Sequence, residues 1–246
     1  MSRPFGGPPN PYAPPTASLE HDGSALHAPA GFRSPKALAQ TITVLLAMYI
    51  VVQVVHIAHL AAAIQAMYRV LAGVASESVE AAAIDRRMTV INGLPALTYL
   101  PAAVLFCMFV FRANKNLRAL DLIHPQFSPG WAVGVFFIPI WNFYKPYQVM
   151  REIWEGSTPD PDAVVVASSL RGPPLLKWWW GLYVASFIHV QVFDQRAGAS
   201  ALIWRAEKAL AGNVVNLVAA VLAIAVVRGV AARQDARQRL RAAPLT

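Results

Sequence analysis

The sequence contains few charged residues. Asp, Glu, Lys and Arg together make up 14% of the 246 residues, whereas about a quarter of the residues of a soluble domain are charged. Hydrophobic residues make up 56% of the chain, and its mean hydropathy is +0.43. The shortage of charge argues against a soluble globular domain and places the chain in the membrane class.

Acidic residues are scarcer than basic ones. The 13 acidic residues face 21 basic ones, which gives a net charge of +8. A basic balance can indicate nucleic-acid binding, but no RNA- or DNA-binding pattern accompanies the charge. Basic residues that flank apolar spans are instead the usual orientation signal of membrane proteins. We therefore expect the partner to be a lipid bilayer and not nucleic acid.

Cysteine is nearly absent, and so are the common catalytic motifs. The single cysteine, Cys107, cannot form an internal disulfide, and its apolar neighbours predict a small buried group. The chain has no glycine-rich phosphate loop and no HExxH, GxSxG or CxxC motif. No catalytic, cofactor-binding or metal site is therefore predicted, and the balance of the sequence is against an enzyme.

Residues 1–36 contain little that could build a core. This segment is rich in residues that prevent regular helix, namely Pro4, Gly6, Gly7, Pro8, Pro9, Pro11, Pro14 and Pro15. Such a composition predicts a disordered tail, which we place in the cytoplasm.

Four apolar stretches are long enough to cross a bilayer, which takes about 20 residues. They cover residues 37–60, 91–111, 175–193 and 209–227. Pro95 and Pro101 lie inside the second stretch and predict a kink there. We expect an all-α membrane protein with four transmembrane helices in a bundle over residues 37–228, followed by a basic cytoplasmic tail over residues 229–246.

A fifth apolar block, residues 131–141, is too short to cross, and Pro139 interrupts it. It predicts a broken helix that is re-entrant or interfacial. The alternative, a fifth crossing, would place the basic tail outside, against the positive-inside tendency. With four crossings, 15 of the 21 basic residues lie on the cytoplasmic side, namely Arg3, Arg33, Lys36, Arg112, Lys115, Arg118, Lys145, Arg151, Arg171, Lys177, Arg228, Arg233, Arg237, Arg239 and Arg241.

The C-terminal tail has two interpretations. Its arginines lie directly after the last span, where each basic residue near anionic lipid contributes about 1 kcal/mol of attraction. The tail is therefore a candidate site for anionic lipid, although a plain topology anchor explains the same charges.

A series of short motifs runs from residue 112 to residue 154. In order, these are Arg112-Ala113-Asn114-Lys115-Asn116-Leu117-Arg118, Ser128-Pro129-Gly130-Trp131, Ile138-Pro139-Ile140-Trp141-Asn142, Lys145-Pro146-Tyr147-Gln148 and Arg151-Glu152-Ile153-Trp154. The series resembles the domain of unknown function 4328 family of bacterial multi-pass membrane proteins. With the Trp178-Trp179 pair and the stretch from Arg228 to Arg237, the resemblance covers roughly residues 40–238. It implies a multi-pass protein of the bacterial cytoplasmic membrane and implies no activity.

The residues that carry the resemblance most clearly form a family signature, which consists of Arg112, Asn116, Pro129, Trp131, Pro139, Asn142, Pro146, Arg151 and Trp154. We interpret them as mainly structural. Ser128 suits a helix cap before a proline in the first turn. Pro139 is expected to end that helix, and Asn142 could bond the carbonyl groups that are left free.

Arg112 and Asn116 are four residues apart and share a helix face. They could anchor the broken element or pair with Glu152 or Glu155. Because broken helices also form binding sites in transporters, a ligand site remains the alternative to the structural role.

A second polar group lies in the outer halves of the spans. Its members are Gln53, His56, His59, His189, Asn213 and Asn216. Hydrogen bonding between helices is the plainest interpretation. An outward-facing solute or ion cavity is the second. A metal or haem site built from the three histidines is the least favoured, since the ligand spacing is wide and carboxylates are scarce.

Two functions therefore compete. The leading one is a non-enzymatic scaffold or sensor that binds partners at the inner membrane face. The alternative is a small-solute or ion transporter or channel that uses the outer polar residues. A transporter requires a polar path from those residues to Asn142, across an inner half that is nearly all apolar in sequence.

Overall fold

A computed structural model describes residues 31–74, 93–120, 125–159, 173–190 and 199–242, although not the side chains of residues 187–190 and 199–202. Within this part every regular element is a helix and no strand is present, as predicted. The elements are α1 (Lys36–Leu71), α3 (Leu94–Ala119), α4 (Pro129–Gly134), the 3-10 turn η1 (Trp141–Phe143), α5 (Lys145–Gly156), α7 (Pro174–Val190) and α8 (Ala199–Ala242).

Three of the described helices, α1, α3 and α8, are long and apolar enough to cross a membrane. Helix α7 has 17 described residues, which at 1.5 Å per residue span about 26 Å. The residues that follow it, 191–198, lie outside the described part of the chain. The protein therefore has the helices of a multi-span membrane protein, while the count of four crossings stays a prediction.

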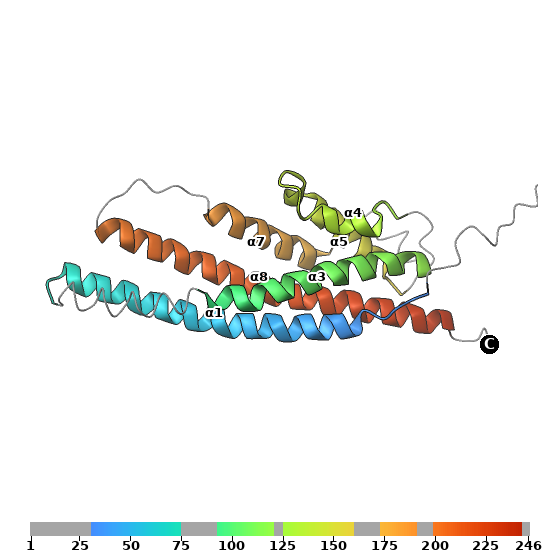
Figure 1. The fold of residues 1–246 in the computed structure, drawn as a ribbon, viewed down its shortest axis with the longest axis horizontal. Coiled ribbons are helices and arrows are strands. Elements are labelled where there is room, and N and C mark those ends of the chain that lie inside the picture. Colours follow the sequence, from blue (N-terminus) through green and yellow to red (C-terminus); the bar gives the residue numbers. More distant parts are fainter. Residues whose placement is uncertain (1–30, 75–92, 121–124, 160–172, 191–198, 243–246) are drawn as a thin grey trace, which may run out of the picture.

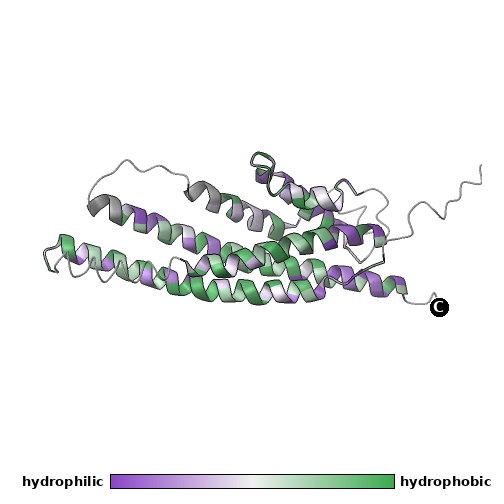
Figure 2. Ribbon diagram, viewed as in Figure 1, coloured by the Kyte–Doolittle hydropathy of each residue, from purple (hydrophilic) through white to green (hydrophobic). Residues whose placement is uncertain are grey.

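The long helices lie side by side along one axis. Helix α1 packs against α8 and α3, and α7 packs against α8. Helix α1 begins at the end of the bundle where α3, α5 and α8 finish (Figure 1). We call this the basic end and the opposite end the far end. Figure 2 shows an apolar middle, with hydrophilic residues at both ends of α8.

The outer surface of the bundle is apolar, as a lipid-facing surface should be. Val44 and Val51 of α1 are 59% and 64% exposed, and Leu100 and Val104 of α3 are each 62% exposed. Soluble monomers rarely expose continuous apolar surface of this kind. Burial in lipid tails, which are as apolar as these side chains, removes it from water.

Two helix boundaries differ from the predicted ones. Helix α3 begins at Leu94, so Pro95 lies in its first turn, where a proline removes no hydrogen bond, and only Pro101 lies in the helix interior. Helix α8 continues to Ala242. The basic segment after residue 228 is therefore a direct extension of the last apolar helix.

Helix α4 starts as predicted and ends earlier. The Ser128 Oγ accepts a hydrogen bond from the Trp131 backbone N–H at 3.4 Å, and Pro129 occupies the first turn. The helix ends at Gly134, five residues before Pro139, so the prediction that Pro139 ends it was wrong. Phe137 and Ile140 are 72% and 76% exposed beyond this end. An exposed apolar turn of this type suits contact with lipid.

Candidate functional site

A buried hydrogen-bond network centred on Asn116 occupies the basic end. Its Nδ2 donates to the Arg33 carbonyl oxygen at 2.9 Å and to Gln234 Oε1 at 2.8 Å. Its Oδ1 accepts from the Arg33 backbone N–H at 3.2 Å. One amide therefore joins α3 to the segment before α1 and to the end of α8.

Gln234 extends the network to α5. Its Nε2 donates to the Ala113 carbonyl oxygen at 2.9 Å and to Ser157 Oγ at 3.1 Å. Ser157 Oγ in turn donates to the Ile153 carbonyl oxygen at 2.5 Å. Both Gln234 and Ser157 are fully buried. Such bonds strengthen one another in a low dielectric, so the four segments are held as one unit.

Arginines of α8 bind the ends of neighbouring helices. Arg237 Nη1 donates to the Gly156 carbonyl oxygen at 2.7 Å, and Arg241 donates to the Ala119 carbonyl oxygen. Helix C-termini carry unpaired carbonyl groups and partial negative charge, so a cation there is favourable. These side chains are therefore used within the protein, although Arg241, like Arg228 and Arg239 of the same segment, is exposed.

The Trp154 ring of α5 makes an apolar contact with α8 at the basic end. The Arg233 guanidinium lies over its ring, 4.3 Å from the centroid. Gly229 of α8 lies so close to the ring that a Cβ there would be 2.7 Å from two ring carbons. The close approach of α8 to α5 therefore requires glycine at this position.

The acidic residues of α5 have other partners than those predicted. Glu155 accepts a hydrogen bond from Arg151 Nε at 2.8 Å. Glu152 accepts one from the Gln126 backbone N–H. Neither carboxylate therefore pairs with Arg112 or Asn116. Burial raises the pKa of the Glu152 carboxyl above its ordinary value.

The rest of the signature positions the broken element. The rings of Trp131 and Trp141 lie 5.5 Å apart, and Pro146 is buried in the first turn of α5. Among the described residues, Asn142 bonds no freed carbonyl group, contrary to the prediction. Its amide hydrogen-bonds the Tyr183 hydroxyl of α7, and its Oδ1 has no partner among the described residues.

A row of polar side chains continues from Asn142 through the middle of the bundle. The Tyr183 hydroxyl is also hydrogen-bonded to Tyr99, whose ring lies 5.6 Å from that of Tyr49. The Tyr49 hydroxyl accepts from Gln53 Nε2 at 3.0 Å. The row therefore joins Gln53, one of the predicted outer polar residues, to Asn142 of the family signature. Along the sequence of the spans, the inner halves between these two levels are nearly all apolar.

A cavity of about 540 Å³ lies beside this row. Eight of its 20 lining residues are aromatic, among them all three tyrosines, Phe106 and Trp180. Of the five predicted outer polar residues whose side chains the structure describes, only Asn216 lines it. The cavity is large enough for a small organic molecule.

The other predicted polar residues do not gather at one point. Gln53 is buried, while His56, His59 and Asn213 are partly exposed. His189 belongs to α7, but its side chain lies outside the described part. Among the side chains that the structure describes, no group of three His, Cys, Asp or Glu residues is placed to hold a metal ion.

Three residues of the basic-end network were not predicted as site residues: Arg33, Ser157 and Gln234. Gln234 had a signal in the sequence, because it continues the helical spacing of the buried Val227 and Val230. A buried position filled by an amide indicates a specific partner. Arg33 and Ser157 gave no such signal, because Arg33 takes part through its backbone N–H and carbonyl groups and Ser157 through its hydroxyl.

The helices and this network define the class: a helical multi-span membrane protein whose basic C-terminal helix is bonded to the ends of α3 and α5. The sequence model of the domain of unknown function DUF4328 matches residues 72–232. This is well over half of the chain, and the protein belongs to that family, as its motifs indicated. No curated protein and no solved structure matches the chain.

Proposed function

We propose that the protein crosses the bacterial cytoplasmic membrane four times, with α7 as a span in addition to α1, α3 and α8, and with both termini in the cytoplasm. The distribution of charge supports this orientation. Near the end of α3 and the end of α8 lie the basic residues Arg112, Lys115, Arg118, Arg228, Arg233, Arg237, Arg239 and Arg241, against Arg69, Arg205 and Lys208 at the far end.

We further propose that it is a non-enzymatic scaffold or sensor that binds protein partners at the basic end. The observation that carries this proposal is the buried network around Asn116 and Gln234, which bonds four separate segments into one platform. A surface that is rigid before binding loses little conformational entropy on binding. The platform presents Arg228, Arg239 and Leu240 to the outside, with Leu240 63% exposed.

Site-specific photo-crosslinking in cells tests the proposal. A photoreactive amino acid at Arg239 or Leu240 is expected to give a discrete protein adduct, and one at the lipid-facing Val51 is not. The adduct should weaken in the Asn116→Leu background, where the platform loosens, and persist in Asn114→Leu. Absence of any protein adduct at the platform positions would contradict the scaffold.

The aromatic cavity favours a second candidate, a small-solute transporter or channel. The row from Gln53 through the tyrosines to Asn142 supplies polar groups across the middle of the bundle. Purified protein in proteoliposomes, assayed for flux of ions and small solutes, distinguishes the candidates. Flux that is lost when the cavity is filled by Ala102→Trp would replace the scaffold with a transporter.

A further inference from the structure

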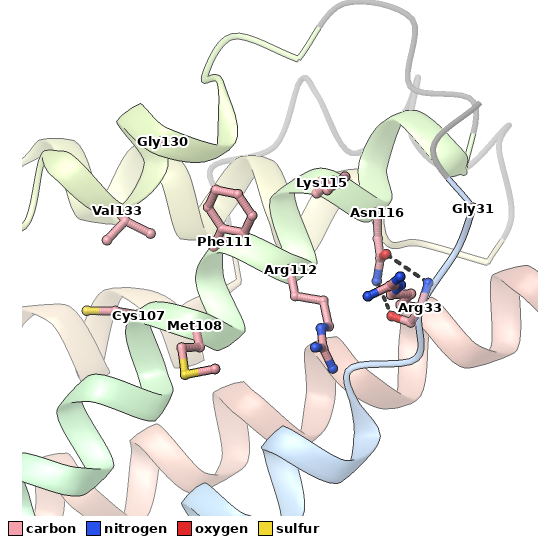
Figure 3. Close-up of a pocket in the computed structure, with 10 residues that line it drawn as sticks. All are labelled: Gly31, Arg33, Cys107, Met108, Phe111, Arg112, Lys115, Asn116, Gly130 and Val133. Carbon is pink, nitrogen blue, oxygen red and sulfur yellow. Dashed lines mark hydrogen bonds between the residues drawn. The ribbon is translucent and has the colours of Figure 1, made fainter. Parts of the chain in front are cut away.

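A groove of about 680 Å³ runs along one face of α3 at the basic end (Figure 3). Met108, Phe111, Arg112 and Lys115 of α3 form its floor. The segment that carries Arg33 forms one wall, and α4 forms the other. The groove is separate from the aromatic cavity, with which it shares only Cys107.

The charge in the groove is entirely positive. Arg33, Arg112 and Lys115 line it, and no acidic residue does. Their cationic side chains make no hydrogen bond or ion pair with the described residues. By contrast, Arg151 and Arg237 nearby are bonded to a carboxylate and to a backbone carbonyl. The groove therefore contains cationic side chains whose charge and hydrogen-bond donors can bind an anion.

The other part of the groove is apolar. Met108 and Phe111 are 50% and 45% exposed, and Val133 of α4 lies opposite. The same face of α3 continues toward the far end through Val104 and Leu100, at the spacing of successive helical turns. From Lys115 to Leu100 this stripe is about 22 Å long at 1.5 Å per residue, which is comparable to an acyl chain.

We propose that the groove binds an anionic phospholipid, with the phosphate at Arg33, Arg112 and Lys115 and an acyl chain along Met108 and Val104. A phospholipid carries charge at one end and hydrocarbon at the other, in the same order as the groove. The sequence assigned anionic lipid to the C-terminal tail. There Arg233, Arg237 and Arg241 are bonded within the protein, which leaves the α3 groove as the better site.

This site goes beyond the proposed function because it needs no protein partner. It requires only that the chain lie in a bilayer with the basic end at a leaflet surface. A protein partner at Arg239 and Leu240 and a lipid at α3 would occupy different faces, so either proposal can fail without the other.

Native mass spectrometry of the full-length protein, released from vesicles of phosphatidylglycerol and phosphatidylcholine, tests the site. In the double variant Arg112→Gln, Lys115→Gln, the amount of retained phosphatidylglycerol should fall by about tenfold or more relative to the wild type. The matched control is Arg228→Gln, Arg239→Gln, which removes the same charge from exposed positions of α8 and should bind as the wild type does.

A third variant tests the apolar half. A side chain at Gly130 would meet no atom within 4 Å of its Cβ, so Gly130→Leu should fold and enter the groove without removing charge. We expect it to lower phosphatidylglycerol binding to a similar degree. Thermal unfolding of each variant serves as the folding check.

Three results would overturn the proposal. The first is equal retention of phosphatidylglycerol by the groove variant and the control. The second is equal binding of phosphatidylcholine and phosphatidylglycerol, which indicates general lipid contact. The third is displacement of the bound lipid by excess inorganic phosphate together with unaltered binding in Gly130→Leu, which indicates a free-anion site.

Discussion

The two ends of the bundle use polar side chains in different ways. At the basic end the Asn116 and Gln234 amides each bond several partners on other segments. Toward the far end, Gln53 Oε1 and His59 Nε2 have no hydrogen-bond partner among the described residues. Hydrogen bonding between helices was the plainest interpretation of the outer-half residues. Among the described residues most such bonds lie at the basic end, while Tyr68 donates to Glu207 Oε1 between α1 and α8 toward the far end. A polar residue in a span is thus not by itself evidence of structural bonding.

The largest effect is expected from Asn116→Leu. It leaves the buried Gln234 Oε1 and the partly buried Arg33 backbone groups without their partner, and a buried group left unsatisfied costs about 1–3 kcal/mol. We expect a loss of about 3 kcal/mol in the free energy of unfolding, measured by denaturation in mixed micelles.

Asn114→Leu is the matched control, two positions away on the same helix. Asn114 is buried, but neither polar atom of its amide has a hydrogen-bond partner in the part of the chain that the structure describes. Replacement by an apolar side chain of similar size should be neutral or stabilising. Equal destabilisation by both variants would show that the network does not hold the basic end together.

Gly229→Ala should have the next largest effect. The added Cβ would lie 2.7 Å from two carbons of the Trp154 ring, so α8 must move away from α5. Overpacking of this degree costs about 1–3 kcal/mol. Gly181→Ala is the control, since a Cβ at Gly181 meets no atom within 4 Å. The melting temperatures of the two variants in detergent should separate clearly.

Glu152→Gln should change the pH dependence of stability by a smaller amount. Burial raises the folded-state pKa of Glu152 above its ordinary value, so the folded protein holds a proton that the unfolded chain has already released. Stability therefore falls as pH rises through the window above the ordinary glutamate pKa.

Glu152→Gln should remove this fall and raise the melting temperature at neutral pH. Melting curves from about pH 4 to about pH 8 measure the effect. Glu155→Gln, which loses the ion pair with Arg151 instead, should keep the fall. If the Glu152→Gln variant shows the same fall in stability as pH rises, the buried Glu152 carboxyl is not the source of that fall.

The smallest effect is expected from Gln53→Leu. The variant loses one hydrogen bond, from Nε2 to the Tyr49 hydroxyl, and also removes a buried oxygen that has no partner among the described residues. These contributions oppose each other, so the net change should lie within about 1 kcal/mol. A loss as large as that of Asn116→Leu would remove the contrast between the two ends.

The helices could be predicted because their signal is local. Long apolar runs and the Ser128-Pro129 start are visible within a single stretch of sequence, and the all-helical fold followed from them. The family followed from the short motifs between residues 112 and 154. Helix ends were less accurate, since α8 continues through a charged segment that hydropathy assigns to a tail.

The network could not be predicted because its partners are far apart in the chain. Asn116 and Gln234 are separated by 118 residues, and nothing near either residue specifies the other. The pairing depends on where α8 lies against α3 and α5, and the approach of α8 to α5 requires Gly229 beside the Trp154 ring. The tyrosine row is similar, because each tyrosine by itself is an ordinary aromatic residue of an apolar helix.

Cysteine accessibility tests the proposed topology, on which the account depends, most directly. In a Cys107→Ser background, single cysteines replace Lys145, Ser200 and Leu240 in intact cells, and a membrane-impermeant thiol reagent is added from outside. A four-span protein with its termini inside should be labelled at position 200, and at positions 145 and 240 only after lysis. Labelling of position 240 from outside would contradict it, since the C-terminal end of α8 would then lie on the outer side of the membrane.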